Sequence, residues 1–118
     1  MAQFRSIVDF EGFYTGSYDG RQAEVEIVVS HPTAGQPIGI SMKFVERERN
    51  LEYSTNFQVS PQDSTTHVLR NITLHAVTGT GDIHWSRLHL HTWDTNFLSG
   101  VSIWNNQEFG MSFSRVGH

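Results

Sequence analysis

The sequence predicts an all-β protein: an eight-stranded antiparallel up-and-down barrel, with a two-sheet β-sandwich as the alternative. Three observations lead to this prediction. Short segments alternate polar and apolar residues with the period of a strand, no stretch keeps the period of an amphipathic helix, and turn-forming residues separate the segments. The 118 residues suffice for one domain with a single core, spanning 1–118.

The predicted strands follow one another along the whole chain. They cover 11–18, 22–30, 38–44, 51–59, 66–77, 83–93, 97–104 and 109–116. Asp19-Gly20 lies between the first two and is a pair favoured in the two-residue type I′ turn, in which both central residues have positive φ. Connections are mostly short, so consecutive strands should be antiparallel neighbours. Short, regular connections favour the closed barrel, which also removes exposed strand edges.

The third and fourth strands flank a hairpin turn at 45–50. Directly opposed residues of an antiparallel pair share a face of the sheet. We therefore expect two sets of alternate residues to lie opposite each other on one face of the sheet: Ile38, Ile40, Met42 and Phe44 on one strand, and Tyr53, Thr55, Phe57 and Val59 on the other.

The last three strands decide which face looks inward. A hairpin tip at Thr95-Asn96 places Arg87 opposite Trp104 and His89 opposite Ser102. Continuing through the turn at 105–108 places Trp104 opposite Phe109. In the final strand the alternate face carries Gly110, Ser112 and Ser114, so the core-facing residues must be Phe109, Met111 and Phe113. By parity, the inward residues of the sixth strand are Trp85, Arg87, His89, His91 and Trp93.

The reverse face then carries an aliphatic patch outside the barrel. Its members are Ile72, Leu74, Leu88, Leu90, Val101 and Ile103. A contiguous apolar patch on a soluble protein indicates a subunit interface, so we expect a homo-oligomer. A one-residue slip in any hairpin would exchange the two faces, and the turn at 94–96 fixes the register least firmly.

Residues 12–17 carry a family resemblance. Gly12-Phe13-Tyr14 resembles the Gly-x-aromatic opening of lipocalins and avidins, and Gly16-Ser17 is similar to the Gly-Ser pair that follows in avidins. The short eight-strand meander looks more like avidin, since lipocalins are longer and add a helix. The resemblance implies a small calycin-like barrel with a ligand cup and an oligomeric outer wall, but biotin binding does not carry over.

The predicted inward face holds side chains suited to a small ligand. Indole rings can stack on a sugar or a planar molecule while neighbouring polar groups fix its orientation. The candidate ligand-binding residues are Tyr14, Asn71, His75, Trp85, Arg87, His89, His91, Trp93 and Trp104. Alternatively, the large rings fill a dry core opposite Gly100 and Ser102, as in a structural or interaction protein.

Catalytic chemistry is the weaker interpretation. His75, His89 and His91 point to one face and could bind zinc, as in a metal-dependent cupin-like enzyme, although a second cupin motif is missing. No nucleophile elbow supports a Ser-His-Asp set. The pattern around Glu24 and Glu26 is typical of a solvated strand face, and 46–49 is typical of a hairpin tip. We therefore expect these acidic residues to supply solubility and not catalysis. We expect no catalytic residue and no cofactor.

Composition excludes several further classes. The absence of cysteine rules out disulfides, thiolate metal sites and a cysteine nucleophile. A net charge of −4 with scattered Lys and Arg argues against nucleic-acid binding. No signal segment or bilayer-spanning run is recognised, so we expect a cytoplasmic protein without a membrane partner. The sequence thus favours a non-enzymatic barrel that binds a small molecule or glycan.

Overall fold

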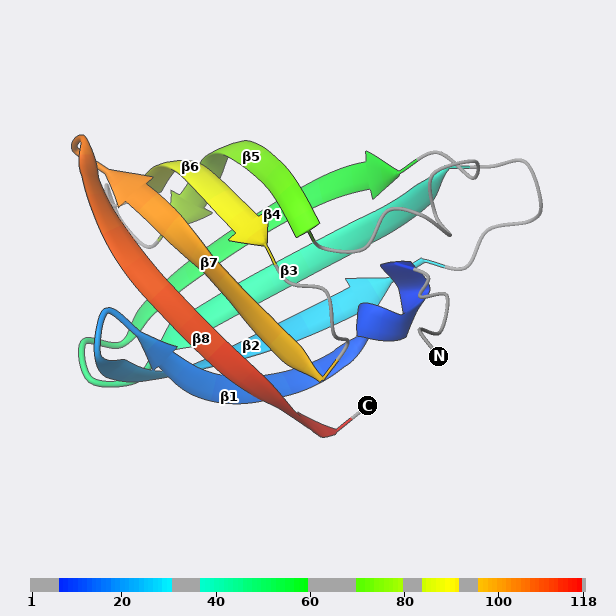
Figure 1. Ribbon diagram of the computed structural model, residues 1–118, viewed down its shortest axis with the longest axis horizontal. Helices are drawn as coiled ribbons and strands as arrows, with labels where there is room; N and C mark the ends of the chain where they lie inside the picture. The colour runs from blue at the N-terminus through cyan, green and yellow to red at the C-terminus, as the bar shows by residue number, and fades with distance from the viewer. Residues whose placement is uncertain (1–6, 31–36, 60–69, 80–83, 92–95, 118) are drawn as a thin grey trace.

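The computed structural model describes residues 7–30, 37–59, 70–79, 84–91 and 96–117. A short 3-10 helix, η1 (Ile7–Phe10), precedes a series of antiparallel strands (Figure 1). The strands are β1 (Gly12–Tyr18), β2 (Arg21–Val29), β3 (Ile38–Glu46), β4 (Leu51–Val59), β5 (Arg70–Gly79), β6 (His84–His91), β7 (Phe97–Trp104) and β8 (Gln107–Gly117). The predicted all-β class is confirmed. Within this described part, no helix is long and apolar enough to cross a membrane.

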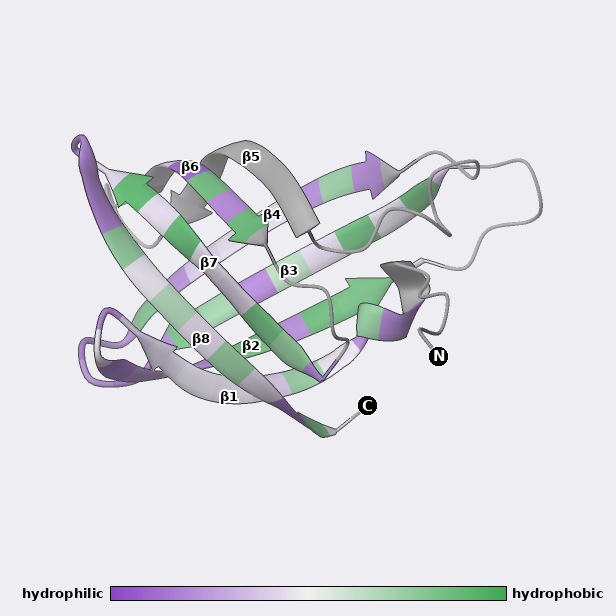
Figure 2. Ribbon diagram, in the orientation of Figure 1, coloured by the Kyte–Doolittle hydropathy of each residue, from purple (hydrophilic) through white to green (hydrophobic). Residues whose placement is uncertain are grey.

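The strands form one curled, barrel-like sheet (Figure 1). Strands consecutive in sequence pair with each other, and β8 also pairs with β1. The ladder between β4 and β5 is short, joining Tyr53 to Gly79 and Ser54 to Thr78. Hydrophobic and hydrophilic positions alternate along β2 and β3 in Figure 2, as a sheet with one buried face requires. The core therefore lies on the inside of the curl.

Two predicted hairpins are confirmed in detail. Asp19 and Gly20 have φ angles of 53° and 77°, as a type I′ turn requires. The ladder of β3 and β4 contains the predicted opposed pairs: Ile38 with Val59, Ile40 with Phe57, Met42 with Thr55, and Phe44 with Tyr53. Alternating apolar residues on both sides of a short turn were enough to fix this register.

The turn between β7 and β8 is tighter than predicted. Asn105 and Asn106 have φ angles of 53° and 63° and form a two-residue turn, so Trp104 opposes Gln107. The expected partner was Phe109, two residues further along. A shift of two residues preserves parity, and Met111 and Phe113 are buried as predicted.

The pairing of β6 with β7 corrects the predicted register. Arg87 opposes Ile103 rather than Trp104, a slip of one residue. Leu90 opposes Gly100, so an odd number of residues lies between these partners. A two-residue tip always leaves an even number between opposed residues, which is why the predicted tip at 95–96 placed the wrong face inward.

The predicted outer aliphatic patch is therefore wrong for its two β6 residues. Leu88 and Leu90 are completely buried in the core of the chain. Val101 and Ile103 are half-buried and alternate with buried residues of β7, so their side chains lie on the outward face of the sheet. Ile72 and Leu74 oppose Leu90 and Leu88 along the backbone ladder, but their side chains lie outside the described residues.

Strand β6 changes face near its middle. Trp85 is buried, as predicted, but Ser86 and Arg87 are both exposed before Leu88 is buried again. Two successive exposed residues interrupt the two-residue period that a parity argument assumes. Arg87 thus points away from the core. His89 lies between two buried leucines and so shares the outward face, contrary to the prediction.

Strands β1 and β8 approach each other closely at Gly16. A Cβ atom on this residue would lie 2.0 Å from the carbonyl oxygen of Ser112 and 2.7 Å from the Cα atom of Phe113. Both contacts are with backbone, which cannot rotate aside as a side chain would. Gly16, one of the residues behind the family resemblance, is thus required by the packing of this ladder.

Helix η1 packs at one end of the curled sheet, away from the β1–β2, β3–β4 and β7–β8 turns (Figure 1). The Tyr14 hydroxyl donates to the carbonyl of Phe10 at 2.8 Å, and Phe10 is fully buried. Arg115 donates to the carbonyls of Asp9 and Glu11 at 2.6 and 2.7 Å. Burial raises the pKa of Tyr14 to about 12, against the effect of Arg115, so this hydroxyl stays protonated and keeps η1 in place.

Candidate ligand-binding site

A cavity of about 270 Å³ lies at the end of the sheet opposite η1. Among the described turns, those of β1–β2, β3–β4 and β7–β8 contribute to its lining, because every second turn of an up-and-down meander lies at the same end. The lining residues are Tyr18, Asp19, Arg49, Leu51, Tyr53, Trp85, Trp104, Gln107 and Phe109. Two further hollows, of about 360 and 350 Å³, involve the outer sides of β1–β3 and β2–β4 and are more open to solvent.

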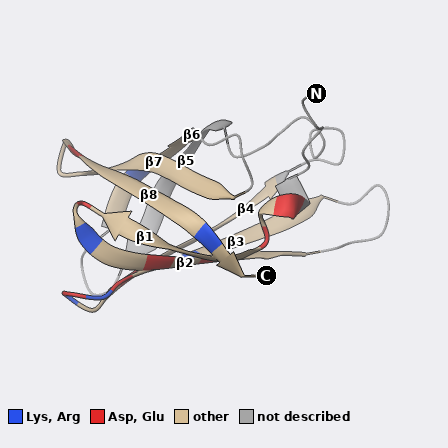
Figure 3. Ribbon diagram, turned by 60° about the horizontal axis from the view of Figure 1, so that its bottom comes forward, with Lys and Arg blue, Asp and Glu red and all other residues tan. Residues whose placement is uncertain are grey.

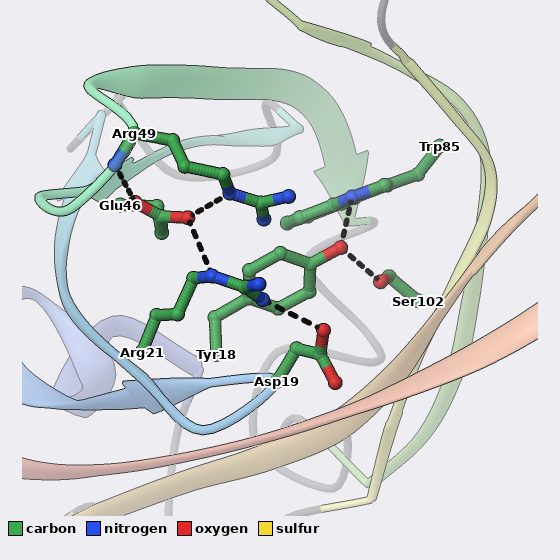
Figure 4. A network of polar contacts seen from close by, with 7 residues as sticks. All are labelled: Tyr18, Asp19, Arg21, Glu46, Arg49, Trp85 and Ser102. Carbon is green, nitrogen blue, oxygen red and sulfur yellow. Dashed lines mark hydrogen bonds and ion pairs between the residues drawn. The ribbon is translucent and has the colours of Figure 1, made fainter.

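The floor of this cavity is an aromatic cluster around Trp85. The ring of Tyr53 stacks on the indole with centroids 4.1 Å apart, and Phe44 and Tyr18 pack at 5.1 and 5.2 Å. The indole N–H donates to the Tyr18 hydroxyl at 3.0 Å, and Ser102 Oγ donates to the same oxygen at 3.3 Å (Figure 4). Stacking and hydrogen bonding together fix the orientation of the rings.

A buried carboxylate holds two arginines beside this floor. Glu46 is only 1% exposed and accepts hydrogen bonds from the backbone N–H of Arg49, at 2.5 Å, and from its Nε. Arg21 Nε lies 3.8 Å from the same carboxylate, and Arg21 Nη1 donates to Asp19 at 2.9 Å (Figure 4). Figure 3 shows the charged residues of the β1–β2 and β3–β4 turns together at this end of the sheet.

Two opposing effects act on the pKa of Glu46. Burial alone would raise it, because a charged carboxylate loses hydration. The hydrogen bonds from Arg49 and the positive charges of Arg49 and Arg21 outweigh burial, so the pKa lies below its ordinary value of 4.5. The sequence-based expectation that the acidic residues of the chain only supply solubility is therefore wrong for Glu46.

We expect Glu46 to make the fold sensitive to acid. A lowered pKa in the folded state means that its contribution is complete well above pH 4.5 and declines as the pH falls toward the folded value. Glu46→Gln should lower stability at pH 7 by no more than about 1.5–3 kcal/mol, because both arginines are partly exposed. Its melting temperature should then fall less steeply than that of the wild type between pH 7 and pH 3.

Glu52 provides the matched control for this measurement. It is a 56% exposed carboxylate that lies 3.4 Å from Lys43 on the neighbouring strand. Exposed ion pairs contribute little, so Glu52→Gln should keep the wild-type slope of melting temperature against pH. If Glu46→Gln also kept the wild-type slope, the Glu46 carboxylate would not be the group that makes the fold sensitive to acid.

The rim of the cavity presents a ring and polar groups to solvent. Trp104 is 41% exposed at the end of β7, and Gln107 follows it across the turn. The Asp19 and Arg49 side chains are 42% and 45% exposed. Glu46 engages the Nε edge of Arg49. Among the described residues, none accepts a hydrogen bond from the terminal guanidinium nitrogens of Arg49.

The cavity gathers only part of the predicted site. Trp85 and Trp104 line it, as floor and rim. Tyr14 is buried near the opposite end beneath η1, and Arg87 and His89 lie on the outward side of β6. The remaining predicted positions fall outside the described residues: the side chains of Asn71, His75 and His91, and the whole of Trp93.

Sequence reasoning missed most of the lining. Most predicted site residues came from the single segment 83–93, whereas the cavity is lined by residues from several strands and turns at one end of the sheet. The sequence did contain a usable signal, because the turns at 19–20, 45–50 and 105–108 alternate with turns of the other end. Tyr18 precedes the first of these turns and Arg49 and Gln107 lie within the other two, so the three residues could have been grouped on that basis.

The predicted metal alternative is not assembled by the part of the chain that the structure describes. Within that part, no three His, Cys, Asp or Glu side chains are grouped closely enough to hold an ion. His89 points outward, and the other two histidines of the alternative lie beyond the described side chains.

Comparison of the chain with protein families, with curated proteins and with solved structures found no match. Nothing found there connects the curled sheet with avidins or lipocalins. The resemblance at residues 12–17 stays a prediction, and the functional interpretation rests on the cavity itself.

Proposed function

We propose that the protein is a non-enzymatic binding protein whose cavity opposite η1 takes up a small molecule or a carbohydrate. The observation that carries this proposal is a fixed aromatic floor combined, in one cavity, with an exposed ring, a carboxylate and a guanidinium. Small-molecule sites typically join an apolar, aromatic lining to a few oriented polar groups. Pockets for drug-sized ligands span about 300–1,000 Å³, so about 270 Å³ favours a compact ligand.

We also infer that the strands close into the predicted eight-stranded barrel. The pairing of β8 with β1 supports closure, and the two residue pairs between β4 and β5 supply the remaining seam. Closure would hold the hairpin turns around the cavity and leave few strand edges open. Of the predicted interface residues with described side chains, Val101 and Ile103 alone still support the predicted homo-oligomer.

A dry-core interaction protein is the second candidate, and one observation favours it. Trp85 and Tyr53 are 1% and 3% exposed, because they cover each other and pack against Phe44 and Tyr18. A ligand cannot enter between rings that are already stacked. Binding at this cavity must therefore use the rim and the edges of the floor, and Trp104 becomes the decisive side chain.

Trp104→Ala tests the proposal, with Phe97→Ala as the matched control. Both rings are exposed, at 41% and 52%, and stand at opposite ends of β7, but only Trp104 lines the cavity. A thermal-shift panel of glycans and small metabolites identifies a ligand, and calorimetry measures its affinity. Loss of a stacking ring worth about 1.4 kcal/mol weakens binding about tenfold.

We expect this loss for Trp104→Ala and wild-type affinity for Phe97→Ala. A panel without a single ligand would favour the dry-core candidate. Equal affinity of both variants for a bound compound would place the binding site elsewhere on the molecule.

A further inference from the structure

We infer that the ligand of this cavity is a neutral hydroxylated ring, as in a monosaccharide, and not an anion or a cation. The inference rests on the proposed function, since it names the ligand class for the same cavity. It is drawn from the charges, the hydrogen-bonding groups and the exposed ring around the rim.

The charged groups at the cavity already compensate one another. Asp19 pairs with Arg21, Glu46 pairs with Arg49, and Arg21 also lies within 3.8 Å of Glu46. Two carboxylates and two guanidinium groups thus form one chain of zero net charge. An anion entering here would meet Asp19, and a cation would meet Arg49. Neither would find a surplus of opposite charge to offset its lost hydration, whereas an uncharged ligand avoids that cost.

The rim offers hydrogen-bond donors and acceptors together. Arg49 can only donate, ionised Asp19 can only accept, and the Gln107 amide can do both. A hydroxyl group also donates and accepts, so neighbouring hydroxyls on one ring can satisfy all three residues. An apolar ligand would cover these groups without replacing their hydrogen bonds to water, which is unfavourable.

The two charged rim residues are held in place before any ligand binds. Glu46 holds Arg49 through both its backbone N–H and its Nε. Asp19 occupies the first central position of a type I′ turn, donates its backbone N–H to the carbonyl of Gly110 at 2.8 Å, and accepts from Arg21. Fixed polar groups lose little conformational entropy on binding, which suits recognition of a small polar ligand.

Aromatic rings of the cavity supply the apolar contacts that a sugar ring needs. The indole of Trp104 is 41% exposed at the rim, and the half-buried Phe109 lines the same cavity. A sugar ring has an apolar C–H face that packs on an aromatic ring while its hydroxyls point to the edges. The closed Trp85–Tyr53 stack keeps the ligand at the rim and favours a single ring.

Matched sugars that differ in charge test this inference. Galactose, galacturonate and galactosamine, and the corresponding glucose series, are titrated by calorimetry into the wild type, Asp19→Asn and Arg49→Gln. We expect a neutral sugar of at least one series to bind at least tenfold more tightly than its two charged forms. Asp19→Asn removes a negative charge and should shift selectivity toward the uronic acid, and Arg49→Gln should shift it toward the amino sugar. Asparagine tolerates positive φ, so the turn at Asp19 persists.

The outcomes separate this inference from the proposed function. Tighter binding of a uronic acid or an amino sugar by the wild type would overturn the neutral-ring inference and leave the binding cavity intact. Binding of other small molecules from the panel, without any of these sugars, would have the same meaning. No binding of any compound would overturn both. A melting curve for each variant checks that lost binding does not reflect unfolding.

Discussion

Leu88→Lys should abolish folding, whereas Val101→Lys should leave a folded protein. The two residues lie on the adjacent strands β6 and β7, and the sequence had placed both on one outer patch. In the structure Leu88 is 0% exposed, while Val101 is half-buried on the opposite face. Replacing a buried leucine forfeits about 1.5–3 kcal/mol and places an unpaired ammonium in the core, which costs several kcal/mol more. Small domains have only about 5–15 kcal/mol of stability.

Circular dichroism and light scattering distinguish the two variants. We expect Leu88→Lys to lose its cooperative thermal transition and Val101→Lys to keep it. A folded Leu88→Lys that only changed oligomeric state would restore the outer patch and reverse the face assignment of β6. A change from oligomer to monomer in Val101→Lys would show that the outer face of β7 is an interface.

Trp85→Ala should cost about 3–5 kcal/mol of unfolding free energy, the usual range for a large buried aromatic residue. The substitution removes the ring that stacks on Tyr53 and meets Phe44, and it removes the donor to the Tyr18 hydroxyl. Trp104→Ala is the control, because its exposed ring should contribute less than about 1 kcal/mol. Urea denaturation measures both. Equal losses would contradict the distinction between a structural floor and an exposed rim.

Local sequence was sufficient to predict the fold where turns and alternation agreed. Asp19-Gly20 specifies its turn through backbone conformation, and the β3–β4 register follows from two alternating strands that match only one way. The β6–β7 pairing failed because alternation does not reveal whether a connection contains an odd or an even number of residues. The change of face between Trp85 and Leu88 is likewise absent from any uniform period.

The candidate site was predicted only in its aromatic part. Trp85 and Trp104 were recognised as large rings, but the sequence could not show that one is buried and the other exposed. Glu46 was interpreted as part of a solvated hairpin tip. Its carboxylate also faces Arg21, which lies on β2 and approaches the β3–β4 hairpin only in three dimensions. Contacts between separate hairpins leave no mark on local residue patterns.

Chemical-shift mapping tests most directly whether the cavity opposite η1 is the binding site. Isotope-labelled protein is titrated with the tightest-binding compound from the sugar and metabolite panels, and amide and indole N–H signals are followed. We expect the largest changes at the Trp104 indole and at the backbone of Asp19, Arg49 and Gln107, with Phe97 and Arg87 unchanged on other surfaces. Shifts confined to Phe97, Arg87 or other outward residues, with the cavity signals unmoved at saturation, would contradict the account.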